Sequence, residues 1–345
     1  MNRLAEIAKL AGVSAATVSR TLTRPEMVAE RTRRRVLNAV QATGFRPNEL
    51  ARSLKQNNSR TIGLVVTDLN PFHATLVKGV QDTAEQNELN VILFTSDDSQ
   101  AREHEALSVL RSHMPQGLIL IPTAHTRHHQ HLLHGLTVVE LDRVSGLGDA
   151  HTVQVQNRKG AAEAVHHLIS LGHRRIGAIF GQPSVSTAHE RVEGYREALA
   201  EAGLAYDEAL IRHGDFLEAS GRKAALELLD VPAIERPTAL FVSNHEMTVG
   251  AILTLRSLGL QMPADISLVS FDDSRLMLLH EPPISVVAQP TYELGVRACE
   301  VLVQALRGEQ EAQPHEAQHR ETQHQEKQHL RLDAPFIPRG STAPP

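Results

Sequence analysis

The N-terminal part of the chain carries apolar residues at helical spacing. Leu4, Ile7, Ala8 and Ala11 recur every three or four residues, which places them on one face of a helix. The sequence Gly-Val-Ser that follows breaks this pattern. Because a serine side chain caps the first turn of a helix well, Ser14 predicts a second helix over residues 15–22.

A third helix is predicted from about residue 30 to residue 43. Pro25 separates it from the second helix, and Gly44 suits its end because glycine adopts the left-handed conformation common after a helix C-terminus. Its apolar face is expected to contain Val36, Leu37 and Val40. Residues 1–44 are therefore expected to form a small all-α unit.

The pattern changes at Thr61, where short runs rich in β-branched residues begin to alternate with amphipathic stretches. This alternation is typical of βαβ units and parallel sheets. The runs are too numerous for one small sheet, so we expect an α/β unit with two stacked lobes. The predicted strands are residues 61–66, 91–95, 117–121, 138–141, 175–180, 239–243, 266–271 and 286–288.

Residues 309–329 form a low-complexity segment rich in Gln, His and Glu. The segment has almost no apolar side chain that could join a core. We expect it either to prolong the preceding helix or to be a disordered insertion.

Charge is distributed unevenly along the chain. Residues 1–60 contain 12 Lys and Arg but only 4 Asp and Glu, whereas the whole chain has a net charge of -5. A basic N-terminal unit on an acidic body indicates that only the N-terminal unit meets a polyanion, such as nucleic acid.

The remaining composition indicates a cytoplasmic protein. The single cysteine, Cys299, excludes an internal disulfide framework and fits a reducing compartment. The N-terminal residues lack the apolar core of a signal peptide, and no stretch of ~18 apolar residues could span a bilayer.

The first two predicted helices have the layout of a helix-turn-helix, in which the second helix enters the DNA major groove. Val18 would point back to the first helix, while Ala15, Ala16, Ser19 and Arg20 would project from the other side. Small residues allow close approach to thymine methyl groups, and arginine pairs with guanine in a bidentate manner. The alternative is a plain α-helical hairpin with a solvated arginine.

At this point the sequence resembles the lactose-repressor (LacI/GalR) family of bacterial transcription regulators. The resemblance extends over nearly the whole chain, in the same order. The motifs that carry it are AGVSAATVSRTL, FRPNELARSLK, IGLVV, LGHRRIGAIFG, R-x-E-G-Y, GDF, SFDD and AQP.

The resemblance implies a hinge helix in the segment PNELARSL, with Leu54 wedged into a central base step from the minor groove. Asn48, Arg52 and Lys55 would then line phosphates or the groove, and Thr17 and Thr32 would take backbone phosphates. The alternative for Leu54 is packing against the sensor unit. The expected DNA-contacting set is Ser14, Ala15, Ala16, Thr17, Ser19, Arg20, Thr32, Asn48, Arg52, Leu54 and Lys55.

The α/β unit is expected to bind a small-molecule effector in the cleft between its lobes, because open parallel sheets bind ligands beyond the carboxyl ends of their strands. The resemblance makes Arg191, Phe216, Asn244 and Asp272 the firmest contacts. A structural cap or an interlobe salt bridge is the alternative for such residues, notably Asp272 and His73. The expected effector-binding set is Phe72, His73, Asp142, Arg191, Phe216, Asn244, Asp272 and Gln289.

The chain departs from the family pattern at two positions. His245 stands where an aspartate is common after the strand, and Arg3 replaces the usual threonine cap of the first helix. The first change bears on the chemistry of the cleft, and the second weakens a cap by ~1 kcal/mol. The C-terminus also lacks a leucine heptad extension, which favours a homodimer over a tetramer.

Histidines occur in two groups that we interpret as non-catalytic. His315-Glu316-Ala317-Gln318-His319 has the spacing of a zinc protease motif but lies in a segment without apolar residues. Metal binding by His315, His319, His324 and His329 remains an alternative. The second group, expected to be a solvated helix face, is His125, His128, His129, His131 and His134.

Together these features predict a DNA-binding repressor and not an enzyme, with no cofactor or catalytic metal. It would bind a double-stranded, pseudo-palindromic operator as a homodimer, under the control of a sugar or nucleoside-like effector. We expect a helix-turn-helix over 1–44, a hinge and linker over 45–59 and a sensor unit over 60–345. Within the sensor unit the N-lobe is about 60–157 and 290–310, and the C-lobe about 158–287 and 330–340.

Three alternatives use the same fold differently. A sugar-binding module of a transporter shares two lobes, but it would need an export signal and would lack residues 1–58. An enzyme would need a catalytic constellation, and the sequence has no Walker loop and no nucleophile elbow. A regulator of this kind that answers to a protein partner would show no melting shift with small molecules.

Overall fold

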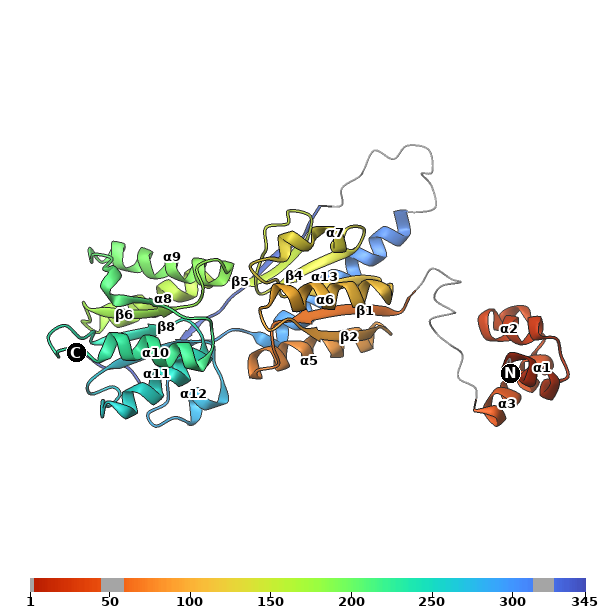
Figure 1. Ribbon diagram of the computed structural model, residues 1–345, viewed down its shortest axis with the longest axis horizontal. Helices are drawn as coiled ribbons and strands as arrows, with labels where there is room; N and C mark the ends of the chain where they lie inside the picture. The colour runs from red at the N-terminus through yellow and green to blue at the C-terminus, as the bar shows by residue number, and fades with distance from the viewer. Residues whose placement is uncertain (1–2, 45–58, 313–325) are drawn as a thin grey trace. The chain divides into compact units, whose positions relative to one another are not determined.

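The computed structural model describes residues 3–44, 59–312 and 326–345. The chain divides into two compact units, Met1–Arg60 and Thr61–Pro345. The smaller unit contains α1 (Arg3–Ala11), α2 (Ala15–Thr23), the 3-10 turn η1 (Pro25–Met27) and α3 (Glu30–Thr43), shown at the red end of Figure 1. We call it the head.

The helices of the head enclose a small aliphatic core. Ile7, Ala8 and Ala11 of α1 pack with Val18 of α2 and with α3, as the helical periodicity predicted. The face of α3 differs from the prediction, because Leu37 is 47% exposed while Val36 and Ala39 are buried. Positions 36, 39 and 40 share one side of a helix, and Leu37 lies about 100° away from Val36 around the helix axis.

Both predicted helix boundaries in the head are confirmed by cap geometry. The Ser14 Oγ accepts a hydrogen bond from the backbone N–H of Thr17 at 3.1 Å. Gly44 has φ +60° and donates its N–H to the last turn of α3. Arg35 adds a clamp that was not predicted, since its Nη2 donates to the Gly12 carbonyl at 3.2 Å and so holds the turn between α1 and α2.

The larger unit is built on two six-stranded sheets. All strand pairs in the first sheet are parallel, in the order β11-β5-β4-β3-β1-β2. Its strands are β1 (Thr61–Val66), β2 (Asn90–Thr95), β3 (Gly117–Leu120), β4 (Thr137–Leu141), β5 (His151–Val155) and β11 (His329–Leu332). This sheet forms the N-lobe.

The second sheet forms the C-lobe, in the order β12-β10-β9-β8-β6-β7. Only the β10–β12 pair is antiparallel. Its strands are β6 (Ile176–Phe180), β7 (Ile211–His213), β8 (Ala239–Val242), β9 (Ser267–Phe271), β10 (Ser285–Val287) and β12 (Phe336–Ile337). The predicted fold class, an α-helical head followed by a two-lobed unit with parallel sheets, is confirmed.

Helices cover both faces of each sheet (Figure 1). In the N-lobe, α5 and α13 share one core with β1, and α6 packs on the other face. In the C-lobe, α8 and α9 cover one face, and α10 and α11 cover the other. The helices and turns of this unit are α5 (Pro71–Gln86), α6 (Gln100–Ser112), η2 (Thr126–His129), α7 (Gln130–Leu133), α8 (Asn157–Ser170), α9 (Ser186–Glu201), η3 (Glu208–Leu210), α10 (Glu218–Leu229), α11 (His245–Ser257), α12 (Arg275–Leu279) and α13 (Thr291–Ala312).

The eight predicted strands are all present, but four others were missed. Of these β5, His-Thr-Val-Gln-Val, is the most central, because it lies between β4 and β11. Its polar His151 and Gln154 are nevertheless buried. The His151 Nδ1 accepts a hydrogen bond from the backbone N–H of Gln328 at 3.1 Å, so a tertiary contact makes burial of this side chain possible.

The chain passes between the lobes after β5, after β10 and again after β11. The third passage lies later than the expected position near residue 330, because β11 pairs with β5 and so belongs to the N-lobe. α13 extends to Ala312, so the start of the Gln/His-rich segment continues that helix, whereas His315, His319 and His324 lie outside the described residues. No helix in the described ranges is both long and apolar enough to cross a bilayer.

Candidate DNA-binding surface and effector cleft

The exposed face of α2 carries the residues predicted to meet DNA. Ala15, Ala16 and Arg20 are exposed, whereas Val18 is fully buried beneath them. This arrangement gives a flat, small-residue surface with one guanidinium, which suits the major groove. Thr32, in the first turn of α3, is half-buried.

Two predicted phosphate or groove contacts in the head also have a structural role. The Ser14 and Thr17 hydroxyls lie 2.9 Å apart at the start of α2, so both contribute to its cap. Ser19 is half-buried. Asn48, Arg52, Leu54 and Lys55 lie outside the described residues.

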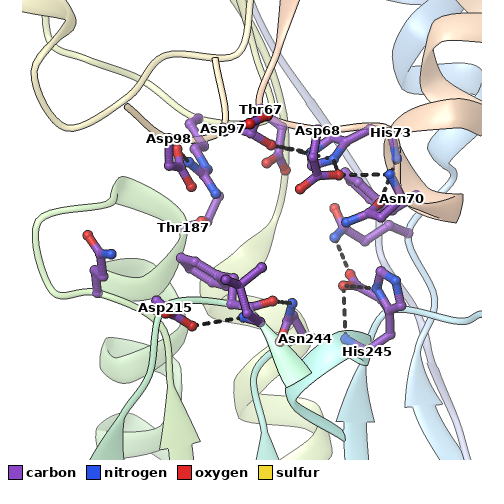
Figure 2. Close-up of a pocket in the computed structure, with 18 of the residues that line it drawn as sticks. Thr67, Asp68, Asn70, His73, Asp97, Asp98, Thr187, Asp215, Asn244 and His245 are labelled. Atoms are coloured by element: carbon purple, nitrogen blue, oxygen red, sulfur yellow. Dashed lines mark hydrogen bonds and ion pairs between the residues drawn. The ribbon is translucent and has the colours of Figure 1, made fainter. Parts of the chain in front are cut away.

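A cavity of about 460 Å³ opens between the lobes, where the carboxyl ends of strands from both sheets meet (Figure 2). A volume of this size fits a small metabolite. All eight residues of the expected effector-binding set line it. The lining residues that sequence reasoning did not include are Thr67, Asp68, Asn70, Asp97, Asp98, Arg143, Gln182, Thr187, Asp215, Leu217 and His245.

Several of the missed residues follow strands that had been predicted. Asp97 and Asp98 come shortly after β2, and Arg143 comes shortly after β4. The strand-end rule therefore had the information to find them. His245 had been expected to bear on the chemistry of the cleft as a departure from the family, but it was not included in the effector-binding set.

The backbone of the cavity wall is strained at several positions. Asp142, Phe216 and Asp272 have φ angles of +63°, +68° and +77°. In the described ranges, seven residues other than glycine have positive φ, and five of them line the cavity, since Asp97 and Asp98 also do. Such conformations cost about 1–3 kcal/mol each and concentrate at functional sites, which supports a binding role for this wall.

Phe216 is held in place by close contacts on both sides. An added Cβ on Gly181 would lie only 2.0 Å from the Cζ atom of the Phe216 ring, so the ring lies directly against the glycine backbone. The Arg143 guanidinium carbon lies 5.2 Å from the ring centroid, and its Nη1 donates to Asp98 at 2.6 Å. The ring is thus a fixed flat surface in the cavity wall.

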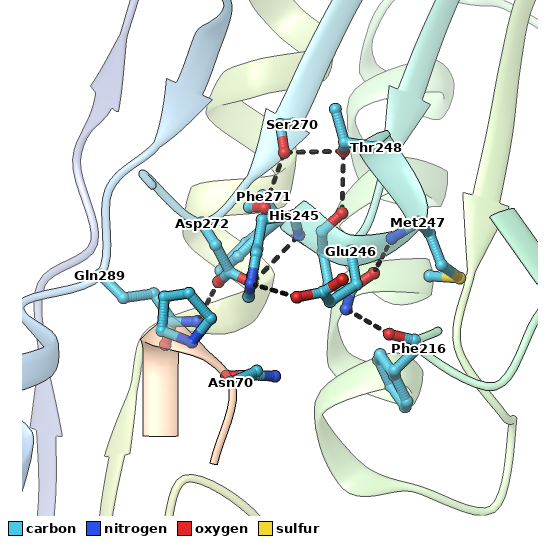
Figure 3. Close-up of polar contacts among 12 residues, drawn as sticks. Asn70, Phe216, His245, Glu246, Met247, Thr248, Ser270, Phe271, Asp272 and Gln289 are labelled. Atoms are coloured by element: carbon cyan, nitrogen blue, oxygen red, sulfur yellow. Dashed lines mark hydrogen bonds and ion pairs between the residues drawn. The ribbon is translucent and has the colours of Figure 1, made fainter. Parts of the chain in front are cut away.

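Asp272 is the centre of a buried hydrogen-bond network (Figure 3). Its Oδ2 accepts from both the backbone N–H and the Nδ1 of His245, each at 3.3 Å. Its Oδ1 accepts from the Gln289 Nε2 at 2.5 Å. The His245 Nε2 lies 3.2 Å from Glu246 Oε1, an electrostatic contact without hydrogen-bond alignment.

The electrostatics of this network follow from its pairing. Burial alone would raise the pKa of Asp272, but the hydrogen bond from His245 and the charge of Arg191 outweigh it and lower that pKa. Burial would lower the pKa of His245, but the hydrogen bond and charge of Asp272 outweigh it and raise that pKa. Both shifts favour the charged forms of the pair, an imidazolium and a carboxylate.

The pKa of Asp142 is shifted in the opposite direction to that of Asp272. Its side chain is buried, and its Oδ1 has no hydrogen-bond partner in the described residues. Burial raises the pKa of Asp142 more than the charges of Arg191 and Arg143 lower it. A buried carboxyl oxygen without a hydrogen-bond partner is costly, and a donor group on a ligand would satisfy it.

Two other predicted effector contacts form hydrogen bonds with other residues of the protein. Asn244 caps α11, because its Oδ1 accepts from the Met247 N–H at 3.0 Å, and its Nδ2 donates to the Phe216 carbonyl at 2.9 Å. His73 pairs through Nδ1 with Asp68 Oδ1 at 2.8 Å. Both side chains line the cavity. Asn244 also has the capping role that was the alternative for it, whereas His73 pairs within the N-lobe and not across the lobes.

Arg191 joins two layers of the C-lobe. Its Nε donates to Asn157 Oδ1 at 2.9 Å, and its Nη1 donates to the Ser243 carbonyl at 2.5 Å. Its guanidinium carbon lies 3.7 Å from the centroid of the Phe271 ring. The arginine therefore supplies a buried positive charge near Asp142 and Asp272 while donating to neutral oxygen atoms.

The histidine group outside the cavity is not one solvated helix face, as had been expected. His129 is buried and pairs through Nδ1 with Glu103 Oε2 at 2.8 Å. Glu103 also accepts from the Thr126 hydroxyl at 2.6 Å and the Thr123 N–H at 3.0 Å. The other four members are exposed. His329, from the proposed metal-binding set, forms a 3.0 Å hydrogen bond with Thr152.

Most of the chain is similar in sequence to known proteins. Residues 3–48 match the model of the bacterial regulatory proteins, lacI family, and residues 165–342 match that of a periplasmic binding protein-like domain. The HTH-type transcriptional repressor CytR of Escherichia coli K12 is 32% identical over 309 residues, which cover 88% of this chain and 89% of CytR.

Two solved structures show the same architecture. The Lac repressor dimer bound to operator and the anti-inducer ONPF has a TM-score of 0.81 at 25% identity, covering 98% of both chains. A complex of the transcriptional regulator CelR with cellobiose has a TM-score of 0.72 at 31% identity, covering 98% of this chain and 99% of that one. Because likeness in sequence and in fold extends from the head through both lobes, the protein belongs to the lacI family of bacterial regulatory proteins.

Proposed function

We propose that the protein is a transcriptional repressor that binds a pseudo-palindromic operator as a homodimer. A small molecule lowers or raises its affinity for that operator. The observation that carries this proposal is the exposed face of α2, where Ala15, Ala16 and Arg20 project from a helix whose Val18 is buried. The Lac repressor dimer, similar in fold, has been solved on its operator. Because operator DNA lies in the cytoplasm of a bacterium, we place the protein there.

Arg20→Ala is expected to relax base preference at one position of each half-site. A bidentate arginine–guanine pair contributes about 1–3 kcal/mol of discrimination, so affinity for the best sequence should fall about 5–150-fold while affinity for random DNA changes little. Selection of bound sequences from a random pool, with wild type and variant in parallel, measures this. Equal selectivity of the two proteins would contradict the assigned role of α2.

Leu54→Ala is expected to weaken specific binding and to leave non-specific binding largely intact. This prediction rests on the sequence resemblance, in which an apolar wedge kinks the operator centre. Titration of operator and scrambled duplexes at two salt concentrations provides the measurement. Lys55→Ala is the control, because loss of a phosphate contact should weaken both duplexes alike and reduce the salt dependence.

The effector is proposed to act through closure of the two lobes around the cavity. Three consecutive residues after β4 already reach across it: Asp142 lies near Arg191, Arg143 stacks on Phe216, and the Val144 N–H donates to Ser186 Oγ at 2.9 Å. A ligand bound here would bias the lobe arrangement and so the two heads. A coupling of about 1–3 kcal/mol would change operator affinity about 5–150-fold.

Homodimer formation is supported by an apolar surface on the C-lobe. Leu276, Leu278 and Leu279 of α12 are 59%, 58% and 76% exposed, while Met277 between them is buried. A cluster of exposed leucines on one short helix is suited to protein contact. Analytical ultracentrifugation of the wild type and of Leu279→Asp tests this. An unchanged monomer–dimer equilibrium in the variant would show that this surface is not the dimer interface.

A further inference from the structure

The wall of the cavity is strongly acidic. Its charged lining residues are six aspartates and two arginines, with two histidines and neither lysine nor glutamate, so its formal charge with neutral histidines is −4. Protonation of both histidines would still leave more negative than positive charges. An anionic ligand would enter this space against like charge.

Three basic side chains of the lining are already bonded to aspartates. Arg143 Nη1 donates to Asp98, and His245 donates to Asp272. His73 pairs with Asp68. Asp97 is bonded by Arg102, which lies outside the lining set. These contacts hold the wall together, whereas Arg191 donates to the neutral oxygens of Asn157 and Ser243.

Asp142 is the exception among the buried carboxylates. The residue is 6% exposed, and its Oδ1 has no hydrogen-bond partner within the described part of the chain. Arg191 lies close enough to affect its charge, but the hydrogen bonds of Arg191 go to Asn157 and Ser243. The Gln289 Oε1, a second acceptor in the lining, is also buried without a partner.

Asp272 offers less to a ligand than Asp142 does. Both of its oxygens already accept hydrogen bonds, from Gln289 and from His245. Because His245 supplies two of these three donors, the departure from the family pattern at this position binds Asp272 into the protein. Asp142 is therefore the carboxylate that is better able to bind a ligand.

We propose that the effector carries a protonated amine, which donates a charge-assisted hydrogen bond to Asp142. This inference rests on the proposed function, since it names the chemical class of ligand for the same cavity. An ammonium group would supply a positive charge that favours the ionised form of Asp142 against the effect of burial, which a neutral hydroxyl does not, and charge-assisted hydrogen bonds are roughly twice as strong as neutral ones. The net negative charge of the lining disfavours phosphorylated and carboxylated ligands.

The rest of the ligand is expected to be a flat or ring-shaped body. Phe72 and Phe216 are the two aromatic carbon rings of the lining, and each is half-buried. Such rings pack against the apolar face of a sugar or a base. The effector class is thus an amine-bearing sugar or similar cyclic amine, with Gln289 Oε1 available to a second donor.

The test uses methylammonium chloride as a minimal probe, compared with tetramethylammonium chloride at equal ionic strength. The two cations carry the same charge, but tetramethylammonium has no N–H to donate. A two-atom probe can bind with an affinity of about millimolar at best, so melting of the full chain is followed over a millimolar to molar range. We expect methylammonium to raise the melting temperature of the wild type relative to tetramethylammonium.

Asp142→Asn should abolish this difference, with an apparent affinity about tenfold to a hundredfold weaker, as for loss of a hydrogen bond to a charged group. Asp149→Asn is the charge-matched control, because its carboxylate is exposed and does not line the cavity. It should retain the wild-type difference. Equal melting of the wild type in the two salts, or a difference that persists in Asp142→Asn, overturns the proposal.

Operator titration of the same proteins without effector separates this inference from the proposed function. Asp142→Asn should bind operator, which also shows that it is folded. If the wild type fails to bind any duplex selectively, the proposed function is wrong while the methylammonium result stands alone. If Asp142→Asn does not fold, equal melting of the wild type in the two salts still overturns the inference.

Discussion

Asp272→Asn is expected to lower the free energy of unfolding of the larger unit by about 3 kcal/mol. The substitution removes the partner of a buried charge, because His245 remains in place with its Nδ1 and N–H directed at position 272. Breaking one side of a buried ion pair typically costs about 3–5 kcal/mol. Urea unfolding of wild type and variant at the same pH measures the difference.

The pH dependence of that difference has a definite shape. Asp272 has a folded pKa below its usual 3.8, so its contribution is present above that value and is lost as pH falls through the folded pKa. His245 has a folded pKa above its usual 6.5, so its contribution is present below 6.5 and is lost as pH rises through the folded pKa. The stability gap should therefore be largest between about pH 4 and 6.5 and narrower on both sides.

Asp333→Asn is the control for the Asp272 experiment. Asp333 pairs with Lys159 at 3.0 Å, but both side chains are more than half exposed. An exposed pair contributes about 0–1 kcal/mol, so this variant should unfold almost like the wild type. A gap for Asp272→Asn that stays constant from acid to alkaline pH would show that the His245–Asp272 charges are not its cause.

Gly79→Ala is expected to destabilise the N-lobe by about 3 kcal/mol. An added Cβ at Gly79 would lie 2.2 Å from the Tyr292 carbonyl oxygen of α13, and one at Gly295 would lie 2.1 Å from the Leu76 carbonyl oxygen of α5. The two helices are in backbone contact at a pair of glycines, so neither can yield by a side-chain rotation. Overpacking that moves backbone costs about 1–3 kcal/mol, at times more.

Gly203→Ala provides the comparison for that loss. Gly203 has φ +67° and no atom within 4 Å of an added Cβ, so alanine there incurs backbone strain alone. That strain is about 1–2 kcal/mol. Calorimetry of the two variants should show the larger loss for Gly79→Ala, and an equal loss would mean that α5 and α13 can separate freely.

Much of this protein could be predicted from local pattern, because the determining physics is local. The alternation of apolar runs and amphipathic stretches is imposed by the burial of strands between helices, and it located eight of the twelve strands in the two sheets. The cap at Ser14 and the left-handed Gly44 depend on neighbours three or four residues away. The strand-end rule and the family resemblance together placed eight residues in one cavity.

The tertiary structure alone decided which polar groups are paired and which are left over. Asp142 and Asp272 both follow strands. Among the described residues, the Oδ1 of Asp142 has no hydrogen-bond partner, whereas both oxygens of Asp272 accept from residues 17 and 27 positions away in the chain. The burial of His129 on Glu103 and of His151 against Gln328 arises in the same way. A polar side chain becomes buried, charged or available to a ligand through its partners in space, and no periodicity in the sequence records those partners.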